Sequence, residues 1–382
     1  MEYKLSDLFD LQMGKTPDRH IPEYWADGTE QWISIADLSK CDKYIEETAE
    51  AISEQAVNDS GIKIIPASTV IMSFKLSIGK VAITPKPMYS NEAIMAFIDK
   101  GVIPIEPTYL YFLLKAKDWD EGTNKAVMGK TLNKATLSQV KVHIHDLAEQ
   151  RKIIRPLEKA ESMVTTRRQQ LTALDTLIKA RFVELFGDSK VNPYGFNKVR
   201  LKDSCEIVTG NTPSRTVDDY YGDYIEWIKT DNIMAEMMYP TRATESLSEV
   251  GLKVGRYVEK GAILMACIAG SVASIGKVCI TDRQVAFNQQ INAIVPKKYN
   301  ALFLYVLLQT SKDYLVEELN MALKGILSKS KLGEKTFILP PMDQQNDFAA
   351  FVAQIDKSKA VVQKALDEAQ TLFDSLMQQY FG

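Results

Sequence analysis

The feature that most constrains this chain is an internal repeat. The second half of the sequence restates the first at an offset of about 195 residues. Matching segments keep the same order in both halves: 4–7 and 200–203, 14–19 and 210–215, 32–33 and 227–228, 77–81 and 274–278, 91–94 and 288–291, 111–114 and 305–308, and 186–187 and 381–382. Such order indicates duplication, so we expect two copies of one structural unit related by an internal pseudo-two-fold.

Each copy combines two kinds of sequence. The first part has short β-type runs separated by Gly, Pro, Asn and Asp clusters, whereas the last part lacks internal glycine and follows a helical period. We therefore predict an α+β fold with mostly-β α/β domains at 1–145 and 188–341. Long helices are predicted at 146–187 and 342–382.

The helical segments carry residues at alternating steps of four and three, which is typical of a coiled coil. The two seams are Ile153, Leu157, Ala160, Val164, Arg167, Leu171, Leu174, Ile178, Arg181 and Leu185, and Phe348, Val352, Ile355, Lys359, Val362, Leu366, Ala369, Phe373, Leu376 and Tyr380. About 40 residues at ~1.5 Å each make a rod of ~60 Å, which would overhang one domain. We expect an antiparallel coiled coil; the alternative is an amphipathic helix packed on its own domain. Pro156 should kink the first helix or mark its first turn.

Composition restricts the class of protein. No apolar run reaches the ~18–20 residues that span a bilayer, and the N-terminus lacks a basic-then-apolar signal layout. Cys41, Cys205, Cys267 and Cys279 form no C-x-x-C pair, which favours reduced thiols in the cytoplasm. Because the net charge is −3 and no basic tail occurs, nucleic-acid binding must come from local patches or from a partner.

The sequence lacks the motifs that a catalytic interpretation needs. The phosphate-loop pattern is incomplete at 14–16 and at 129–131, and no Gly-x-Gly-x-x-Gly precedes a helix. His143 and His145 alternate at a predicted strand end without a third ligand nearby, which favours packing over metal binding. We expect a non-catalytic chain; the enzyme alternative, a nuclease or methyltransferase with an unfamiliar site, would show turnover in isolation.

A family resemblance rests on several motifs. Leu-Pro-Pro-Met-Asp-Gln-Gln at 339–345 runs into the second helix and resembles the hinge of specificity subunits of Type I restriction-modification systems. The Gly-x-Thr-Pro-x-Arg turns, the Trp-Ile pairs and Ile-Gly-Lys-Val with a following Asn-x-x-Ile resemble that family's target recognition domains, in both halves. The first hinge, 143–150, keeps Leu-x-Glu-Gln but lacks the Pro pair.

The resemblance implies a division of labour. Each recognition domain would read one half of a split double-stranded DNA target, and the helices would set the gap between the halves. Two methyltransferase subunits would dock around the helices, and restriction subunits can join them or be missing from a modification-only complex. S-adenosylmethionine, ATP and Mg²⁺ would belong to those partners, leaving this chain without a cofactor or metal.

Candidate DNA contacts follow from comparing the copies. Side chains that both copies share are suited to a scaffold role or to contacts with the DNA backbone. Loops that differ between the copies are suited to selecting DNA bases. The shared turns and strands supply Lys15, Thr16, Arg19, Lys80, Thr212, Arg215 and Lys277. The unshared pairs of loops are 40–44 and 235–239, 73–76 and 270–273, 85–89 and 282–285, and 125–134 and 320–329. They supply Lys43, Ser73, Lys75, Lys86, Ser271, Arg283 and Lys329. Trp32 and Trp227 are predicted to be core residues rather than base-stacking platforms.

A different class of protein stays open as the alternative. A duplicated coiled-coil adaptor that binds proteins and no DNA explains the acidic first domain better than a DNA reader does. Such an adaptor would show no salt-sensitive DNA affinity, even with its partners present.

Overall fold

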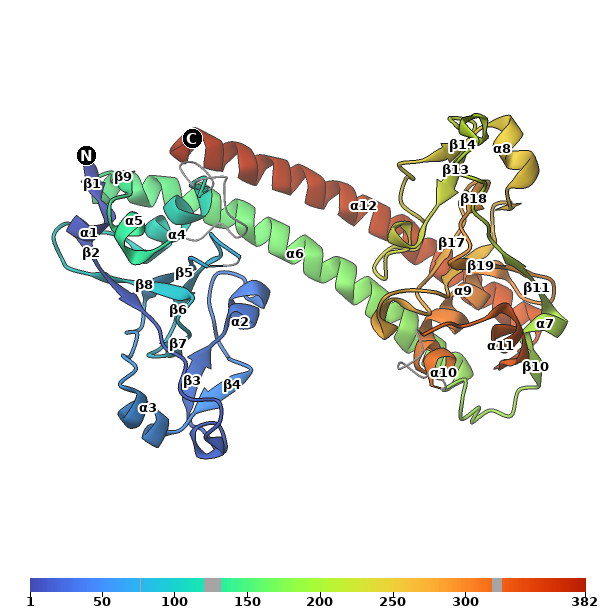
Figure 1. Cartoon of the computed structure of the whole chain (residues 1–382), viewed down its shortest axis with the longest axis horizontal. Helices are drawn as coiled ribbons and strands as arrows, with labels where there is room; N and C mark the ends of the chain where they lie inside the picture. The colour runs from blue at the N-terminus through green and yellow to red at the C-terminus, as the bar shows by residue number, and fades with distance from the viewer. Residues whose placement is uncertain (76, 120–131, 318–324) are drawn as a thin grey trace. The chain divides into compact units, whose positions relative to one another are not determined.

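The computed structural model describes residues 1–75, 77–119, 132–317 and 325–382. The chain forms two units: unit 1 comprises 1–166 with 365–382, and unit 2 comprises 167–364. Two long helices, α6 (Leu147–Phe186) and α12 (Met342–Phe381), each contribute residues to both units (Figure 1).

Unit 1 contains a four-stranded sheet in the order β2-β8-β5-β6, a three-stranded sheet in the order β4-β3-β7, and the pair β1-β9. All pairings are antiparallel except β3 with β7. The strands are β1 (Glu2–Lys4), β2 (Phe9–Met13), β3 (Glu30–Ile33), β4 (Glu50–Ile52), β5 (Thr69–Ser73), β6 (Val81–Thr84), β7 (Tyr89–Ser90), β8 (Ile94–Asp99) and β9 (Lys141–His143). The shorter helices are α1 (Leu5–Leu8), η1 (Pro22–Tyr24), α2 (Ile35–Lys40), α3 (Glu54–Ser60), α4 (Pro107–Ala116) and α5 (Lys134–Ser138).

Unit 2 contains a four-stranded sheet in the order β11-β19-β16-β17, a five-stranded sheet in the order β12-β14-β13-β18-β15, and the pair β10-β20. The strands are β10 (Lys198–Arg200), β11 (Cys205–Thr209), β12 (Tyr221–Gly222), β13 (Ile225–Ile228), β14 (Ser246–Leu247), β15 (Tyr257–Val258), β16 (Ile263–Ala266), β17 (Val278–Ile280), β18 (Val285–Phe287), β19 (Ile291–Pro296) and β20 (Thr336–Ile338). The shorter helices are α7 (Leu201–Ser204), η2 (Asp218–Tyr220), η3 (Thr230–Asn232), α8 (Glu249–Val254), η4 (Val272–Ser274), α9 (Ala301–Thr310), α10 (Lys312–Val316) and α11 (Lys329–Glu334).

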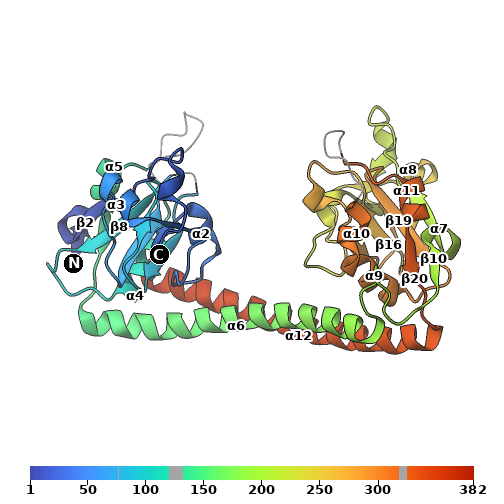
Figure 2. The same ribbon diagram turned by 90° about the horizontal axis from the view of Figure 1, so that it is seen from below.

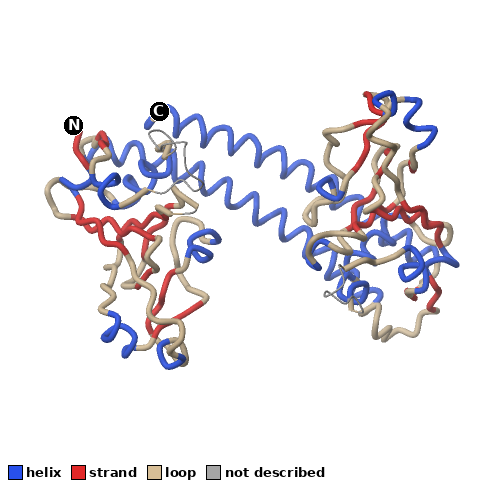
Figure 3. Tube along the Cα trace, viewed as in Figure 1, coloured by secondary structure: helices blue, strands red, loops and turns tan. Residues whose placement is uncertain are grey.

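The topology repeats as the sequence does. The order β11-β19-β16-β17 matches β2-β8-β5-β6, and β14-β13-β18 matches β4-β3-β7, including its parallel pair. Unit 2 adds β12 and β15 at the edges of its smaller sheet. Figure 3 shows the same mixture of short red strands and blue helices in each globular part. The predicted α+β fold with an internal repeat is confirmed.

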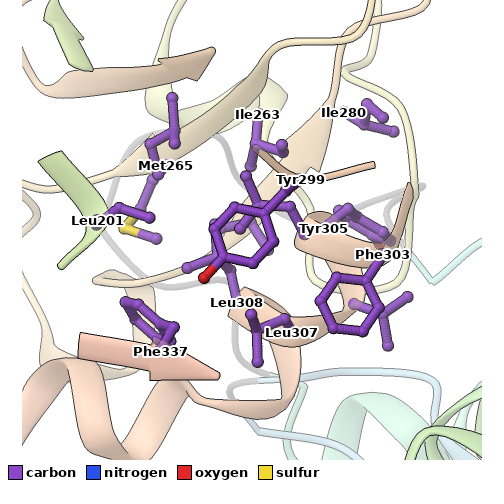
Figure 4. Packing of buried hydrophobic residues seen from close by; sticks show 14 of the residues in the cluster. Leu201, Ile263, Met265, Ile280, Tyr299, Phe303, Tyr305, Leu307, Leu308 and Phe337 are labelled. Atoms are coloured by element: carbon purple, nitrogen blue, oxygen red, sulfur yellow. The ribbon is translucent and has the colours of Figure 1, made fainter. Parts of the chain in front are cut away.

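The main core of unit 2 lies where the four-stranded sheet meets α9. Ile263 and Met265 of β16 face this core, and Phe303 of α9 lies opposite them (Figure 4). The alternate residues of the same strand, Leu264 and Ala266, face a second buried cluster. Both faces of β16 are therefore covered, as the two-residue period of a strand allows, and each fully buried large side chain contributes about 1.5–3 kcal/mol.

The long helices pack against each other in opposite directions within each unit. In unit 1, Ile153 and Leu157 of α6 share a cluster with Phe373 and Met377 of α12, and the two helix ends lie side by side in Figures 1 and 2. In unit 2, the cluster joins Ile178, Phe182 and Phe186 of α6 with Phe348, Val352 and Ile355 of α12. The predicted antiparallel coiled coil is confirmed, rather than a helix packed only on its own domain.

The seam departs from prediction at the C-terminal end of both helices. Phe182 and Phe186 are buried where Arg181 and Leu185 were predicted, while the Arg181 side chain is 41% exposed and pairs with Glu184. In α12, Met377 is likewise buried and Leu376 only half-buried. A straight helix drifts relative to a strict heptad repeat, and these ends pack on the globular parts as well as on the other helix.

Pro156 does not mark the start of α6. The helix begins at Leu147 and continues through Pro156 to Phe186, so the proline lies beyond the first turn. Asp146 caps this start, because its carboxylate accepts a 2.9 Å hydrogen bond from the backbone N–H of Glu149. The first hinge therefore begins its helix sharply without a Pro pair.

Candidate nucleic-acid interface

In unit 1, the shared arginine of the Thr-Pro turn is held in a cage of aromatic and acidic side chains. The Arg19 guanidinium lies 3.6 Å from the ring centroid of Trp25 and 5.0 Å from that of Trp32. It also donates to Glu50 at 2.9 Å, and this bond raises the pKa of Arg19 and lowers that of Glu50. The side chain stays 46% exposed. One face of the guanidinium therefore fixes the turn while the rest is open to solvent.

The same cage occurs in unit 2. The Arg215 guanidinium lies 4.4 Å from the ring centroid of Tyr221 and 5.1 Å from that of Trp227, and it pairs with Glu245 at 2.6 Å. Glu245 stands at the repeat position of Glu50, and the two copies therefore share this glutamate as well as the arginine. Trp32 and Trp227 are buried, as predicted. The repeated cage indicates a scaffold role for both arginines.

The turns themselves are tied to the Asn-x-x-Ile segments. A Cβ at Gly14 would lie 2.2 Å from the carbonyl oxygen of Asn91, which explains why glycine begins this turn; Gly210 meets Asn288 in the same way. The Thr16 hydroxyl donates to Glu92, and the Thr212 hydroxyl donates to Gln289. Both threonines therefore hold the turn closed. The Lys15 ammonium donates to the carbonyl of Ser60, although its side chain is exposed.

Three predicted contacts are turned into the protein. Ser73 is fully buried, and its hydroxyl donates to the carbonyl of Ser77 and accepts from the N–H of Lys80. Arg283 is 21% exposed and bonds Glu226 at 2.8 and 2.9 Å. Lys43 is 15% exposed and contacts Glu158 of α6 at 2.8 Å. Tertiary partners that the loop sequences do not reveal occupy these side chains, and DNA contact by them stays a prediction.

The remaining predicted side chains reach the surface. Lys86 is exposed between β6 and β7, Ser271 is exposed before η4, and Lys329 is exposed at the start of α11. Lys75 is half-buried beside the ring of Phe74, with 5.3 Å between its ammonium and the ring centroid. Of the loops 125–134 and 320–329, the parts 125–131 and 320–324 lie outside the described residues.

Lys80 and Lys277 are shared cations of a different kind from the caged arginines. Each follows a glycine with positive φ, +83° at Gly79 and +76° at Gly276, a conformation that favours glycine. Both lysines are half-buried, and within the described parts of the chain neither has an ion-pair partner. The turn therefore presents an uncompensated cation at the same place in each copy, which suits contact with a phosphate.

Each globular domain is fastened to the beginning of its helix by a buried glutamine. Gln150 accepts a 2.9 Å hydrogen bond from the N–H of Glu106 and donates to the carbonyls of Pro104 and His145. Gln345 accepts from the N–H of Asn300 at 2.9 Å and donates to the carbonyl of Pro340. The Leu-x-Glu-Gln hinge and the Met-Asp-Gln-Gln hinge therefore attach their domains in the same way, through the last glutamine of each motif. This gives a structural reason for a glutamine that the two sequences have in common.

His143, His145 and the four cysteines have packing roles. His145 Nδ1 lies 2.8 Å from the Tyr109 hydroxyl, and its ring contacts that of His143. In the described part of the chain, no three His, Cys, Asp or Glu side chains gather as metal ligands. The four cysteines are free, and burial raises their pKa to about 11 or 12.

Comparison with known proteins gives this architecture a family. The Type I restriction modification DNA specificity domain matches residues 1–175 and again residues 193–370. The chain belongs to this family. It is a specificity subunit, which is a non-catalytic component of Type I restriction-modification systems, as the sequence predicted.

Relatives and solved structures agree with this family. The specificity subunit of the Type I restriction enzyme MjaIX of Methanocaldococcus jannaschii is 25% identical over 406 residues, covering 98% of this chain and 90% of the relative. The HindI specificity subunit of Haemophilus influenzae is 30% identical over 161 residues, covering 37% of this chain and 34% of the relative. The S subunit crystal structure from M. genitalium has a TM-score of 0.54 at 13% identity, covering 100% of this chain and 96% of that one. This last likeness shows the shared fold.

The long helices are not membrane spans. Among the helices that the structure describes, none has an apolar stretch long enough to cross a bilayer. Their apolar residues instead face each other and the globular parts.

Proposed function

We propose that this chain reads a bipartite double-stranded DNA target, with the recognition domain of each unit reading one half-site. The observation that carries the proposal is a repeated scaffold with unlike loops. Both units have the arginine cage and the unpaired lysine turn, but the loop after β6 exposes Lys86, whereas the matching loop of unit 2 turns Arg283 inward toward Glu226. A common framework that presents different side chains suits two readers of different sequences.

The two long helices would set the gap between the half-sites. Each has 40 residues, so each is about 60 Å long at ~1.5 Å per residue. At ~3.4 Å per base pair, this length limits the separation of two readers to about 17 base pairs. The helices would also hold two methyltransferase subunits, to which restriction subunits can be added. S-adenosylmethionine, ATP and Mg²⁺ would reside on those partners.

The shared lysines would supply contacts that do not depend on sequence. Lys80 and Lys277 occupy the same turn in each unit and lack an ion-pair partner among the described residues. Contacts from such side chains to phosphates would place each domain on the duplex, while the unlike loops choose bases. The arginine cages would keep the neighbouring turns in shape.

The test is a methylation map of DNA from cells that carry this chain together with its methyltransferase subunit. Cells with the methyltransferase subunit alone provide the control. A split motif that is methylated only when both are present is the expected result and gives the specificity directly. A stable, active complex that leaves no such motif would favour the adaptor alternative.

A further inference from the structure

One loop of each recognition domain links the edge of the main sheet to a long helix. In unit 1 this is the segment 41–45, which follows α2. The backbone N–H of Ile83 in the edge strand β6 donates to the carbonyl of Lys43 at 2.8 Å, and Ile45 N–H donates back to the Ile83 carbonyl at 3.2 Å. Ile45 is also 1% exposed. The loop is therefore fixed to the sheet on one side.

The side chain of this loop contacts α6 on the other side. The Lys43 ammonium lies 2.8 Å from Glu158 Oε1 and 3.6 Å from Glu161 Oε2. It also lies 5.5 Å from the ring centroid of Phe112 on α4. Partial burial strengthens such a contact, because water screens it less than it screens a surface ion pair.

Glu161 is the point at which three elements meet. Its Oε1 accepts a 2.7 Å hydrogen bond from the Tyr111 hydroxyl and a 3.0 Å bond from the Lys115 ammonium, both on α4. Only 17% of the Glu161 side chain is exposed. Burial raises the pKa of Tyr111, and the Glu161 carboxylate raises it further, so the phenol stays a donor. One carboxylate thus joins α6, α4 and the loop.

Unit 2 repeats this connection with different chemistry. Asp356 of α12 stands at the repeat position of Glu161, and it accepts a 2.8 Å hydrogen bond from the Tyr239 hydroxyl. The preceding residue, Met238, accepts a 2.8 Å bond from the N–H of Ile280 in the edge strand β17. A phenol replaces the ammonium, but the helix acid, the loop and the edge strand are the same.

These acids give each domain a second attachment to its helix. The first is the buried glutamine of the hinge, Gln150 or Gln345. Glu161 and Asp356 follow those glutamines by about 11 residues, or ~16 Å along a helix. Two attachments at this spacing resist tilting, whereas one allows it. A tilt of about 7° moves a point 30 Å away by ~3.4 Å, the rise of one base pair, and 30 Å is about twice the radius of gyration of a domain of this size.

We propose that Glu161 and Asp356 are positioning residues that fix the tilt of each recognition domain on the long helices and so make the required gap strict. The inference rests on the proposed bipartite reading. Neither acid needs to touch DNA: each acts through the loop and the edge strand. Loss of the attachment would therefore relax the gap and leave the half-sites unchanged.

The test uses the complete complex and a set of targets with natural half-sites and gaps of the natural length or one base pair longer or shorter. Methylation rates on these targets give a gap preference for wild type, Glu161→Ala and Asp356→Ala, which remove the side-chain acceptor. We expect each variant to lower that preference several-fold while the methylated half-sites stay the same. Glu184→Ala is the matched control, because Glu184 lies on the same helix α6, is 65% exposed and pairs with Arg181 three residues away.

Tyr239→Phe is a second variant for the case in which a substitution on the helix prevents folding. It removes only the hydroxyl that donates a hydrogen bond to Asp356. If Tyr239 acts through this bond, Tyr239→Phe combined with Asp356→Ala relaxes the gap no further than Asp356→Ala alone. An unchanged gap preference in assembled variants overturns the positioning role while leaving bipartite reading intact. Failure of wild type to methylate any split motif would instead refute the proposed function.

Discussion

The Lys359–Asp175 pair allows a quantitative test of how the helices are held together. Lys359 interrupts the apolar seam of α12, and its ammonium lies 2.6 Å from Asp175 Oδ1 on α6. The lysine side chain is 16% exposed and the aspartate side chain 40% exposed. At the repeat position of α6 stands Val164, which is 6% exposed. Lys359→Val therefore gives the second helix the residue that the first already uses.

The expected effects follow from two opposing terms. Exposed pairs contribute about 0.2–1 kcal/mol, and breaking buried pairs costs about 3–5 kcal/mol. For this partly buried pair, Lys359→Ala should cost about 1–2 kcal/mol, because it removes both the pair and the packing of the lysine stem. Lys359→Val loses the same pair but buries an apolar side chain worth about 1.5 kcal/mol. We expect its stability to lie within about 1 kcal/mol of wild type.

Hydrogen exchange of the full chain measures this difference locally. The amides of α12 around Lys359 should exchange about 5- to 30-fold faster in Lys359→Ala, whereas Lys359→Val should stay close to wild type. Lys152→Ala provides the control, since Lys152 is 72% exposed and pairs with Glu149 on the surface. Equal acceleration in Lys359→Ala and Lys359→Val would refute the reasoning, because it would leave no role for burial at this seam position.

Further predictions concern acid stability, spacing and affinity. Burial alone would raise the pKa of Glu226, but hydrogen bonds, led by the one from Arg283, lower this pKa from 4.5 to about 2. The stability of the folded protein should therefore fall as the pH drops from about 4.5 to about 2. In acid unfolding, Glu226→Gln should lose less stability than wild type over this range. Equal acid sensitivity would contradict this account. Deleting one heptad from each long helix should shorten the gap in the methylated motif without altering its half-sites; an unchanged gap would exclude the helices as the ruler. Lys80→Gln or Lys277→Gln should weaken DNA binding by the complex on all sequences and reduce the salt slope by about 0.9 each. A change confined to one half-site would instead assign the lysine to base reading.

The repeat predicted the architecture because duplication is visible without knowledge of tertiary contacts. Two like halves require two like domains, and a sustained step of four and three requires a helical partner. The same reasoning failed at Phe182 and Phe186, because a heptad seam assumes that the other helix is the only partner. Those rings also pack on Phe303 of α9, with centroid distances of 5.7 and 4.9 Å.

The partners of the loop side chains could not be predicted from the sequence, because loop side chains have no periodicity. Lys43, Ser73 and Arg283 resemble DNA contacts in sequence, yet each has an intramolecular partner that lies far away in the chain or in a tight turn. Glu161 and Asp356 gave no signal, since an acid on a helix is ordinarily a solvated residue. Comparing charged positions between the two copies would have shown that both helices keep an acid at this place.

The net charge of −3 becomes compatible with DNA reading once paired and unpaired cations are separated. Arg19, Arg215 and Arg283 are compensated by Glu50, Glu245 and Glu226, so these pairs hold loops in shape and add little attraction for phosphates. Attraction then falls to lysines outside these pairs, such as Lys80 and Lys86 in unit 1 and Lys277 and Lys329 in unit 2. Each phosphate contact from such a lysine would add to counterion release, whatever the net charge of the chain. The local placement of these cations, rather than the net charge, would therefore decide how strongly each domain holds a duplex.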